Sequence, residues 1–181
     1  MHKPLVSIII GSDSDLLVMS ESAKILDEFN IVYELTIVSA HRTPKRMYDF
    51  AKKAHTRGIQ IIIAGAGGAA HLPGMVASLS PLPVIGVPVQ TKAMNGLDSL
   101  YSIVQMPPGI PVATMAINGA KNAGILAAKI IAINDAKIQK KVLAYMQDLN
   151  DTVIAKATKL EKKGYKKYLN GSYKSQVPNN K

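Results

Sequence analysis

The sequence contains no cysteine among its 181 residues, so disulfide bonds, thiolate metal sites and cysteine nucleophiles are all excluded. Charge is also missing over a long stretch. From Gly58 to Thr91 there is no Asp, Glu, Lys or Arg, and His71 is the only titratable side chain. Glycine and proline interrupt this stretch repeatedly, which argues against a membrane hairpin. We therefore expect a deeply buried or oligomer-covered region and no membrane insertion.

The amino-terminal residues lack the features of an export signal. Met1-His2-Lys3-Pro4 leads into a strand-like run, with neither an apolar h-region nor a small-residue cleavage site. Together with the missing cysteines, this leads us to expect a cytoplasmic protein. Hydrophobic residues make up 48% of the chain and charged residues 19%, which is typical of a folded globular domain.

The net charge of +10 is concentrated near the carboxyl terminus. From Lys156 to Lys181 there are eight lysines and one glutamate, whereas the rest of the chain has 14 basic and 11 acidic residues. That larger part has no arginine cluster and no aromatic residues interleaved with bases, so we expect no nucleic-acid binding. We expect one domain over residues 1–155, which includes a carboxyl-terminal helix. Residues 156–181 are expected to form a lysine-rich helix end and a partly flexible tail of unassigned role.

Five short runs rich in valine and isoleucine alternate with helix-like segments, which predicts a parallel sheet. The runs are Leu5–Gly11, Tyr33–Val38, Ile59–Ala64, Val84–Pro88 and Val112–Met115. Several of them are apolar on both faces, as expected of strands that helices cover on each side. We predict a three-layer α/β/α sandwich with the flavodoxin-like strand order 2-1-3-4-5.

Helices are predicted from apolar spacing and from capping signals. Residues 15–29 carry Leu17 and Leu26 at helical spacing. Thr43 is expected to cap a helix in which Pro44 takes the first position, and Pro73 opens a third helix in the same way. Near the end, apolar residues recur at steps of three, four or seven: Ile138, Val142, Tyr145, Leu149, Val153 and Leu160. This stripe predicts one long helix that packs on its own domain or, as we favour, on a partner subunit.

Polar motifs follow the first three predicted strands, at the edge where the carboxyl ends of parallel strands meet. Gly11-Ser12-Asp13-Ser14-Asp15 follows the first strand, Ser39-Ala40-His41-Arg42 the second, and the glycine-rich loop 65–71 the third. In the predicted strand order these loops are neighbours in space. The sequence therefore predicts one binding site.

The first two loops favour a sugar phosphate as the ligand. Ser12 and Ser14 offer hydroxyls and backbone N–H groups to an anion, although serine and aspartate are also ordinary N-cap residues. A phosphate would repel Asp15, which is expected instead to accept hydrogen bonds from sugar hydroxyls. Arg42 can hold a phosphate with two parallel hydrogen bonds. His41 is the neighbouring side chain best suited to exchange a proton at neutral pH, whereas His55 is expected only to be solvated.

Two other ligands are weighed for this site. His41 and His71 suggest a metal, but no further ligands lie at suitable spacing, so we expect none. The pattern Gly65-x-Gly67-x-x-Ala70 matches a dinucleotide fingerprint. No Asp or Glu occurs between Asp49 and Asp98, however, so the acidic residue that would hold the ribose is missing. We interpret the glycines as allowing close backbone approach to a small flat ligand.

Taken together, the motifs resemble the PurE family of purine biosynthesis over residues 5 to 150. The resemblance rests on the first two loops with Thr43-Pro44, and on Ala64–Gly74, Gly86–Val89 and Asp98–Pro107. It implies the class I enzyme, a mutase that converts the carbamate form of carboxyaminoimidazole ribonucleotide into the form carboxylated on ring carbon, without cofactor or metal. Class II relatives carboxylate aminoimidazole ribonucleotide directly and carry lysine where this chain has Arg42, so the resemblance favours class I.

The resemblance also implies roles for the site residues. His41 is the general acid and base, and carbon dioxide is a trapped intermediate. Ser12, Asp15 and Arg42 hold the ribose phosphate and Ser39 assists, while Gly67 and His71 line the base and carboxylate pocket. Ser14, Ala40 and Leu72 complete the predicted substrate-binding set.

The family further implies a homo-octamer. Two features depart from its pattern: the segment 117–122 is shorter than in many relatives, and the lysine-rich end has no counterpart. Two alternatives stay open, a direct carboxylase and a flavodoxin-like nucleotide-binding module that senses rather than reacts.

Overall fold

The computed structural model describes residues 3–172, and the part of the lysine-rich tail from residue 173 onward lies outside the described residues. The chain divides into two compact units between Gln139 and Lys140. The first unit contains the sheet and its covering helices. The second contains most of the last helix. Among the described residues, no helix combines the length and the apolar character needed to cross a membrane.

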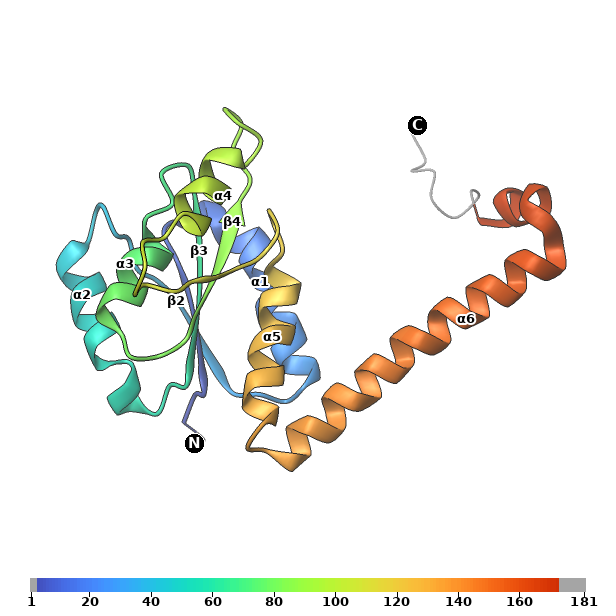
Figure 1. Cartoon of the computed structure of the whole chain (residues 1–181), viewed down its shortest axis with the longest axis horizontal. Helices are drawn as coiled ribbons and strands as arrows, with labels where there is room; N and C mark the ends of the chain where they lie inside the picture. Colours follow the sequence, from blue (N-terminus) through green and yellow to red (C-terminus); the bar gives the residue numbers. More distant parts are fainter. Residues whose placement is uncertain (1–2, 173–181) are drawn as a thin grey trace. The chain divides into compact units, whose positions relative to one another are not determined.

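A five-stranded parallel sheet forms the centre of the first unit, in the order β2-β1-β3-β4-β5 (Figure 1). Its strands are β1 (Val6–Ile10), β2 (Tyr33–Ile37), β3 (Ile61–Gly67), β4 (Val84–Val89) and β5 (Ala113–Thr114). The predicted strand order is confirmed, but most strand ends differ from the prediction by one to three residues. Strand β3 continues past the predicted end at Ala64 to Gly67, and β5 is shorter than the predicted run 112–115.

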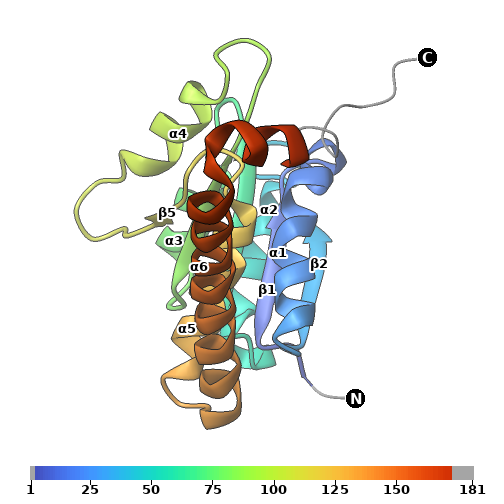
Figure 2. The ribbon, with the colours of Figure 1, turned by 90° about the vertical axis from the view of Figure 1, so that its right-hand side faces the viewer.

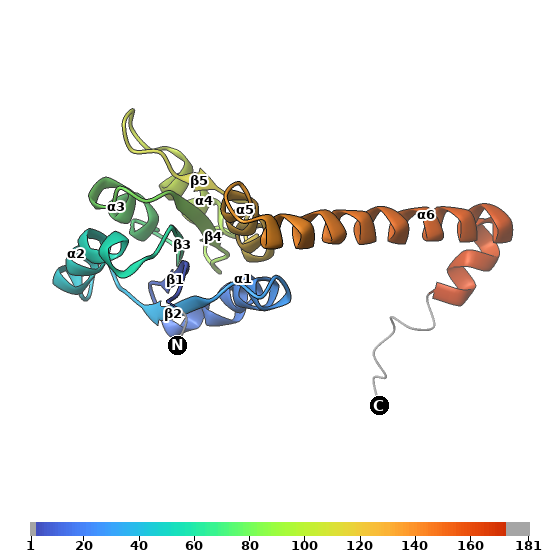
Figure 3. The same cartoon turned by 90° about the horizontal axis from the view of Figure 1, so that it is seen from below.

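Helices cover both faces of the sheet, which confirms the three-layer architecture (Figure 3). One face carries α1 (Leu16–Glu28) and α5 (Ala120–Ala132); the other carries α2 (Pro44–Lys53), α3 (Leu72–Leu79) and α4 (Leu97–Val104). Two short 3-10 turns, η1 (Asp13–Asp15) and η2 (His55–Arg57), precede α1 and follow α2.

The charge-free stretch from Gly58 to Thr91 contains β3, α3 and β4. All residues of β4 and all of β3 except Gly67 are buried. Between these strands and α2 to α4 lies a core that includes Ile62, Val76 and Ile103. A charge in such a place would lose its hydration without a partner, so the central strands explain why the stretch has none.

One local prediction is confirmed only in part and another is wrong. Thr43 is the N-cap residue of α2 and Pro44 takes the first helical position, as predicted. The Thr43 side chain makes no capping hydrogen bond to α2. Its Oγ1 instead accepts a hydrogen bond from the Ser39 N–H at 3.1 Å and donates one to the Ser39 carbonyl at 3.0 Å, so Thr43 closes the loop after β2. Leu17 does not belong to the buried face of α1, because it is 83% exposed. That face consists of Met19, Ser22, Ala23, Ile25 and Leu26.

Helices α1 and α5 pack closely through small residues. Ser22 is fully buried and its Oγ donates a hydrogen bond to the Ala120 carbonyl at 2.6 Å. Gly124 of α5 faces Ile25, and a Cβ at this position would overlap the isoleucine side chain. The contact between these helices therefore requires glycine at position 124.

The predicted long carboxyl-terminal helix is confirmed as α6 (Ala136–Ser172). It starts in the first unit and continues through the second, where Gly164 has the non-helical angles φ 68° and ψ 154° and the helix bends (Figure 2). Large apolar side chains of the second unit are exposed: Leu143, Met146, Leu149, Val153, Ile154, Leu160, Tyr165 and Leu169.

Candidate active site

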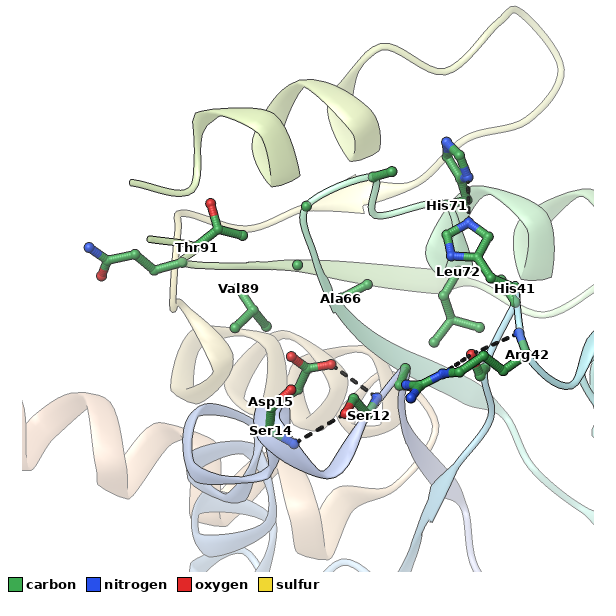
Figure 4. Close-up of a pocket in the computed structure, with 17 residues that line it drawn as sticks. Ser12, Ser14, Asp15, His41, Arg42, Ala66, His71, Leu72, Val89 and Thr91 are labelled. Atoms are coloured by element: carbon green, nitrogen blue, oxygen red, sulfur yellow. Dashed lines mark hydrogen bonds between the residues drawn. The ribbon is translucent and has the colours of Figure 1, made fainter. Parts of the chain in front are cut away.

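A cavity of about 370 Å³ lies at the carboxyl ends of β1 to β4 (Figure 4). All ten residues predicted for the site line it: Ser12, Ser14, Asp15, Ser39, Ala40, His41, Arg42, Gly67, His71 and Leu72. They come together because the strands are parallel, so the loops that follow them share one edge of the sheet. The volume suits a small-molecule ligand.

The loop after β1 is held by its own side chains. The Ser12 N–H donates to Asp15 Oδ2 at 3.2 Å, and the Ser14 N–H donates to Ser12 Oγ at 3.4 Å and to Asp13 Oδ1 at 3.1 Å. These reciprocal bonds form a capping box around η1. The N–H groups that we expected to offer to an anion are therefore engaged within the turn. The Ser12 hydroxyl also donates within the turn, to Asp13 Oδ1 at 3.0 Å, so a ligand at this loop would have to compete with that bond.

Asp15 is the buried carboxyl group of the site, with 7% of its surface exposed. Burial raises its pKa above the ordinary value of 3.8, against the lowering effects of hydrogen bonds from Ser12, Ser14 and Gly11 and of the Arg42 charge. Figure 4 shows Asp15 beside Ser12 and Ser14 along one side of the cavity. An acceptor held in this way suits the hydroxyl groups of a sugar.

Arg42 links the loops after β1 and β2. Its backbone N–H donates to Ser39 Oγ at 3.2 Å, and its Nη2 donates to the Gly11 carbonyl at 3.0 Å. Ser39 is buried, so its hydroxyl is a fixed anchor for the arginine. The guanidinium is thereby placed next to the Ser12 turn, where one anion can contact both.

His41 and His71 touch each other across the cavity wall. The distance from His41 Nε2 to His71 Nδ1 is 2.8 Å, and the two rings are nearly perpendicular, at 86° (Figure 4). One ring nitrogen is the donor of this hydrogen bond and the other is its acceptor, so the orientation of each imidazole is coupled to the other. Both residues are exposed, so the pair can exchange protons with solvent or with a ligand.

His41 and His71 are the two side chains that suggested a metal ligand set. Within residues 3–172, no group of three or more His, Asp or Glu side chains is arranged to hold a metal ion. The facing nitrogens of His41 and His71 bond to each other instead. His55 is exposed on η2 and is not part of the cavity.

Sequence reasoning missed the wall that follows β4, which is made of Val89, Gln90 and Thr91. The sequence did contain a signal for this wall. The predicted fourth strand lies next to the third, so its carboxyl end lies at the same edge of the sheet as the other loops of the site. The buried side chains of Ala66, Leu72 and Val89 give the cavity an apolar wall.

The loops and the cavity can be compared with known proteins. A family model described as AIR carboxylase matches residues 5–152. The chain belongs to the AIR carboxylase family. The match includes every predicted site residue and stops before the lysine-rich end.

Relatives in this family carry two names. The chain is 65% identical to N5-carboxyaminoimidazole ribonucleotide mutase of Thermotoga maritima, over 92% of this chain and 98% of that protein. It is 62% identical to the protein of the same name from Pyrococcus horikoshii, over 93% and 95%. It is also 58% identical to phosphoribosylaminoimidazole carboxylase of Schizosaccharomyces pombe, over 93% of this chain but only 30% of that protein.

Solved structures agree with the family. The crystal structure of Treponema denticola PurE superposes with a TM-score of 0.80 at 32% identity, and covers 87% of this chain and 98% of that one. The flavodoxin-like sandwich is thus the fold of this AIR carboxylase family member as well.

Proposed function

We propose that this chain is an N5-carboxyaminoimidazole ribonucleotide mutase of purine biosynthesis, in which His41 moves the proton. The observation that carries the proposal is the meeting of His41, Arg42 and Asp15 at one cavity in a chain so similar to proteins of that name. The catalytic domain spans residues 1–155. The enzyme is cytoplasmic and works as a homo-octamer, to which the apolar side chains exposed on α6 contribute contact surface.

The substrate contacts follow from the side chains. Arg42 and the hydroxyls of Ser12 and Ser14 bind the phosphate, with Ser39 holding the arginine in place. Asp15 accepts hydrogen bonds from the ribose. Gly67, Ala40, His71 and Leu72 surround the imidazole ring and its carboxylate. No cofactor is needed for these steps.

The reaction is a transfer of one carboxyl group within the substrate. The bond between the exocyclic nitrogen and the carboxyl carbon breaks, carbon dioxide leaves, and protonated His41 gives the nitrogen a proton. The electron-rich ring carbon then attacks the carbon dioxide, and His41 removes the proton from that carbon. Since His41 gives one proton and takes one back, it ends as it began.

The apolar wall suits the intermediate. Carbon dioxide is uncharged, and Ala66, Leu72 and Val89 offer it a surface with no side-chain groups that bind water. Exclusion of water keeps the gas beside the ring carbon until it reacts. The charge-free stretch from Gly58 to Thr91 supplies all three residues, and its only titratable side chain is His71.

Direct carboxylation is the second candidate, because the Schizosaccharomyces pombe relative is named a carboxylase. One assay separates the two activities. The purified protein is offered the carbamate substrate, and separately aminoimidazole ribonucleotide with carbon dioxide, and carboxylated product is followed. We expect efficient conversion of the carbamate only. Efficient conversion of aminoimidazole ribonucleotide would support the carboxylase, and conversion of neither would support a binding module.

The role of His41 is tested with His41→Asn. We expect kcat to fall by about 10²- to 10⁴-fold, because a positioned acid and base contributes that much. The melting temperature should stay near that of the wild type because His41 is exposed. His55→Asn removes another exposed imidazole, outside the cavity, and is the matched control. A His41→Asn protein that turns over at the wild-type rate would remove His41 from the mechanism.

A further inference from the structure

Helix α4 holds two loops of the site from behind, through residues of its first turns. The Thr91 hydroxyl, at the cavity wall, donates to the Asp98 carboxylate, whose oxygens lie 3.0 and 2.9 Å away. The Ser99 hydroxyl accepts a hydrogen bond from the N–H of Gly68, in the loop after β3. The Ser102 hydroxyl lies 3.3 Å from the Gly68 carbonyl but is closer to the Asp98 carbonyl of its own helix, at 2.7 Å. None of these α4 residues lines the cavity, so they can act on a ligand only through the loops.

The Ser99 hydroxyl bridges the ends of two strands. Ser99 is fully buried, and its Oγ donates to the Val89 carbonyl at 2.6 Å while accepting from the Gly68 N–H at 2.9 Å. A hydroxyl has a single proton to donate, so this arrangement fixes the direction of both bonds. The end of β4 and the loop after β3 are therefore tied to the same oxygen atom.

Gly68 is the point at which this loop is held. Its φ of +73° lies in the left-handed region that favours glycine. Its carbonyl accepts from the Ala70 N–H at 2.8 Å. With the N–H bound to Ser99, both polar groups of this residue are fixed. His71 follows three positions later, immediately before α3.

We propose that Ser99 is a positioning residue, whose hydroxyl fixes Gly68 and thereby holds His71 against His41. The inference rests on the proposed function, which makes His41 the proton carrier. Without the hydroxyl, the Gly68 N–H loses its acceptor and the loop relaxes toward other conformations. The 2.8 Å contact between the two imidazoles is then no longer held from the side of His71.

The test compares Ser99→Ala with Ser22→Ala. Both serines are fully buried, and both donate a hydrogen bond of 2.6 Å to a backbone carbonyl. Ser22 lies between α1 and α5, away from the cavity. Its replacement by alanine therefore removes an equally buried hydrogen bond but leaves the loop after β3 untouched. The measurements are steady-state kinetics and amide hydrogen exchange of segment 66–72 by mass spectrometry.

We expect Ser99→Ala to lower kcat by about 10- to 100-fold, as small displacements of reacting groups do. KM should change less than about threefold, because the phosphate contacts stay in place. Exchange in segment 66–72 should become at least about tenfold faster. Ser22→Ala should leave kcat, KM and the exchange rate of segment 66–72 unchanged. Wild-type kcat in Ser99→Ala, or an equal loss in Ser22→Ala, would overturn the proposal.

A double-mutant cycle tests the route through His71. If Ser99 acts through that imidazole, Ser99→Ala should add less than about twofold to the loss already caused by His71→Ala. Fully multiplicative losses would contradict the proposal. Should Ser99→Ala not fold, Ser99→Cys keeps nearly the same volume but replaces the hydroxyl with a weaker donor and acceptor, and must show the same changes in smaller measure. Hydrogen exchange needs no substrate, so a wild-type protein without mutase activity would refute the proposed function while still deciding whether Ser99 holds the loop.

Discussion

Asp15 is a buried carboxyl group, and its burial makes its charged form unfavourable in the folded protein. Because its pKa is raised by burial, the folded protein takes up a proton on this carboxyl more readily than the unfolded chain. The stabilisation given by the protonated form is complete below pH 3.8 and is lost as the pH rises through the raised pKa of the folded state. At neutral pH, Asp15 is therefore a source of instability that the site retains.

We predict that Asp15→Asn becomes more stable relative to the wild type as the pH increases from 3 to 7, because a neutral amide avoids the cost of burying the charge. Turnover should fall at least about tenfold, since the ribose contacts that we propose for Asp15 need the carboxylate. Urea unfolding at several pH values measures the first effect. Asp13→Asn removes an exposed carboxylate of the same turn and is the control for the change in net charge. A stability difference that shrinks toward neutral pH would contradict the prediction.

All ten residues predicted for the site line the cavity, because they belong to the carboxyl ends of the first three strands and the segments that follow them, which the parallel sheet brings together. Their roles in binding and catalysis stay predictions. The sequence could not predict the role of Ser99. The partner of that hydroxyl, Gly68, lies 31 residues earlier in the chain. Nothing in the local pattern distinguishes a serine that holds a loop from one that faces its own helix. The engaged N–H groups of the Ser12 turn had a sequence signal, because Ser12-x-x-Asp15 is the pattern of a capping box.

Elements at the β2 edge of the sheet are tied together by one carboxylate. Glu34 of β2 accepts two hydrogen bonds of 2.7 Å from Arg57 of η2 and one of 2.9 Å from Ser7, its register partner on β1. Burial alone would raise the pKa of Glu34, but these hydrogen bonds and the Arg57 charge outweigh it and the pKa is lowered. Three elements therefore share a bond network that depends on a charged glutamate.

We predict that Glu34→Gln lowers the free energy of unfolding by about 1 kcal/mol at neutral pH, the upper range for a solvent-screened pair. A lowered carboxyl pKa gives stability that is present above the unfolded value of 4.5 and lost as the pH falls through the folded value. The deficit of the variant should thus vanish in acid. Asp49→Asn, which breaks the exposed Lys45–Asp49 pair, should cost less. An equal deficit at pH 3 and pH 7 would refute the pH argument.

The order of the elements was predictable and their ends were not. Apolar runs of the right length predicted the five strands, and the flavodoxin-like pattern of alternating strands and helices predicted their order, which the structure confirms. The end of β3 at Gly67 depends instead on its pairing with Val89 of β4, which no local signal reports. Thr43 has the sequence of a cap, yet its hydroxyl bonds to Ser39 because that loop closes on itself.

The whole molecule is proposed to assemble, and α6 offers a test. Leu149 and Val153 are 52% and 64% exposed and lie four residues apart on the helix. We predict that Val153→Glu shifts the protein to smaller assemblies in light scattering, because burial of an unpaired carboxylate in an interface is unfavourable. Thr158→Glu adds the same charge on another face of the helix and should leave the mass unchanged. An octamer that survives Val153→Glu but not Thr158→Glu would place the interface elsewhere.

The lysine-rich end lies beyond the part of the chain that matches the family. The family model stops at residue 152, and the predicted boundary between residues 155 and 156 stays a prediction. The last described helical residue is Ser172. A truncation after residue 155 that keeps full turnover would support this boundary.

The parallel direction of the sheet has a consequence for mutational tolerance. All the candidate chemistry lies in loops at the carboxyl edge, while the loops 29–32, 58–60 and 80–83 enter the strands at the opposite edge. Substitutions at that edge should alter cellular abundance without changing turnover per molecule, whereas those at the carboxyl edge should do the reverse. A pooled variant library scored separately for abundance and for growth without purines would therefore separate into two populations along the length of every strand.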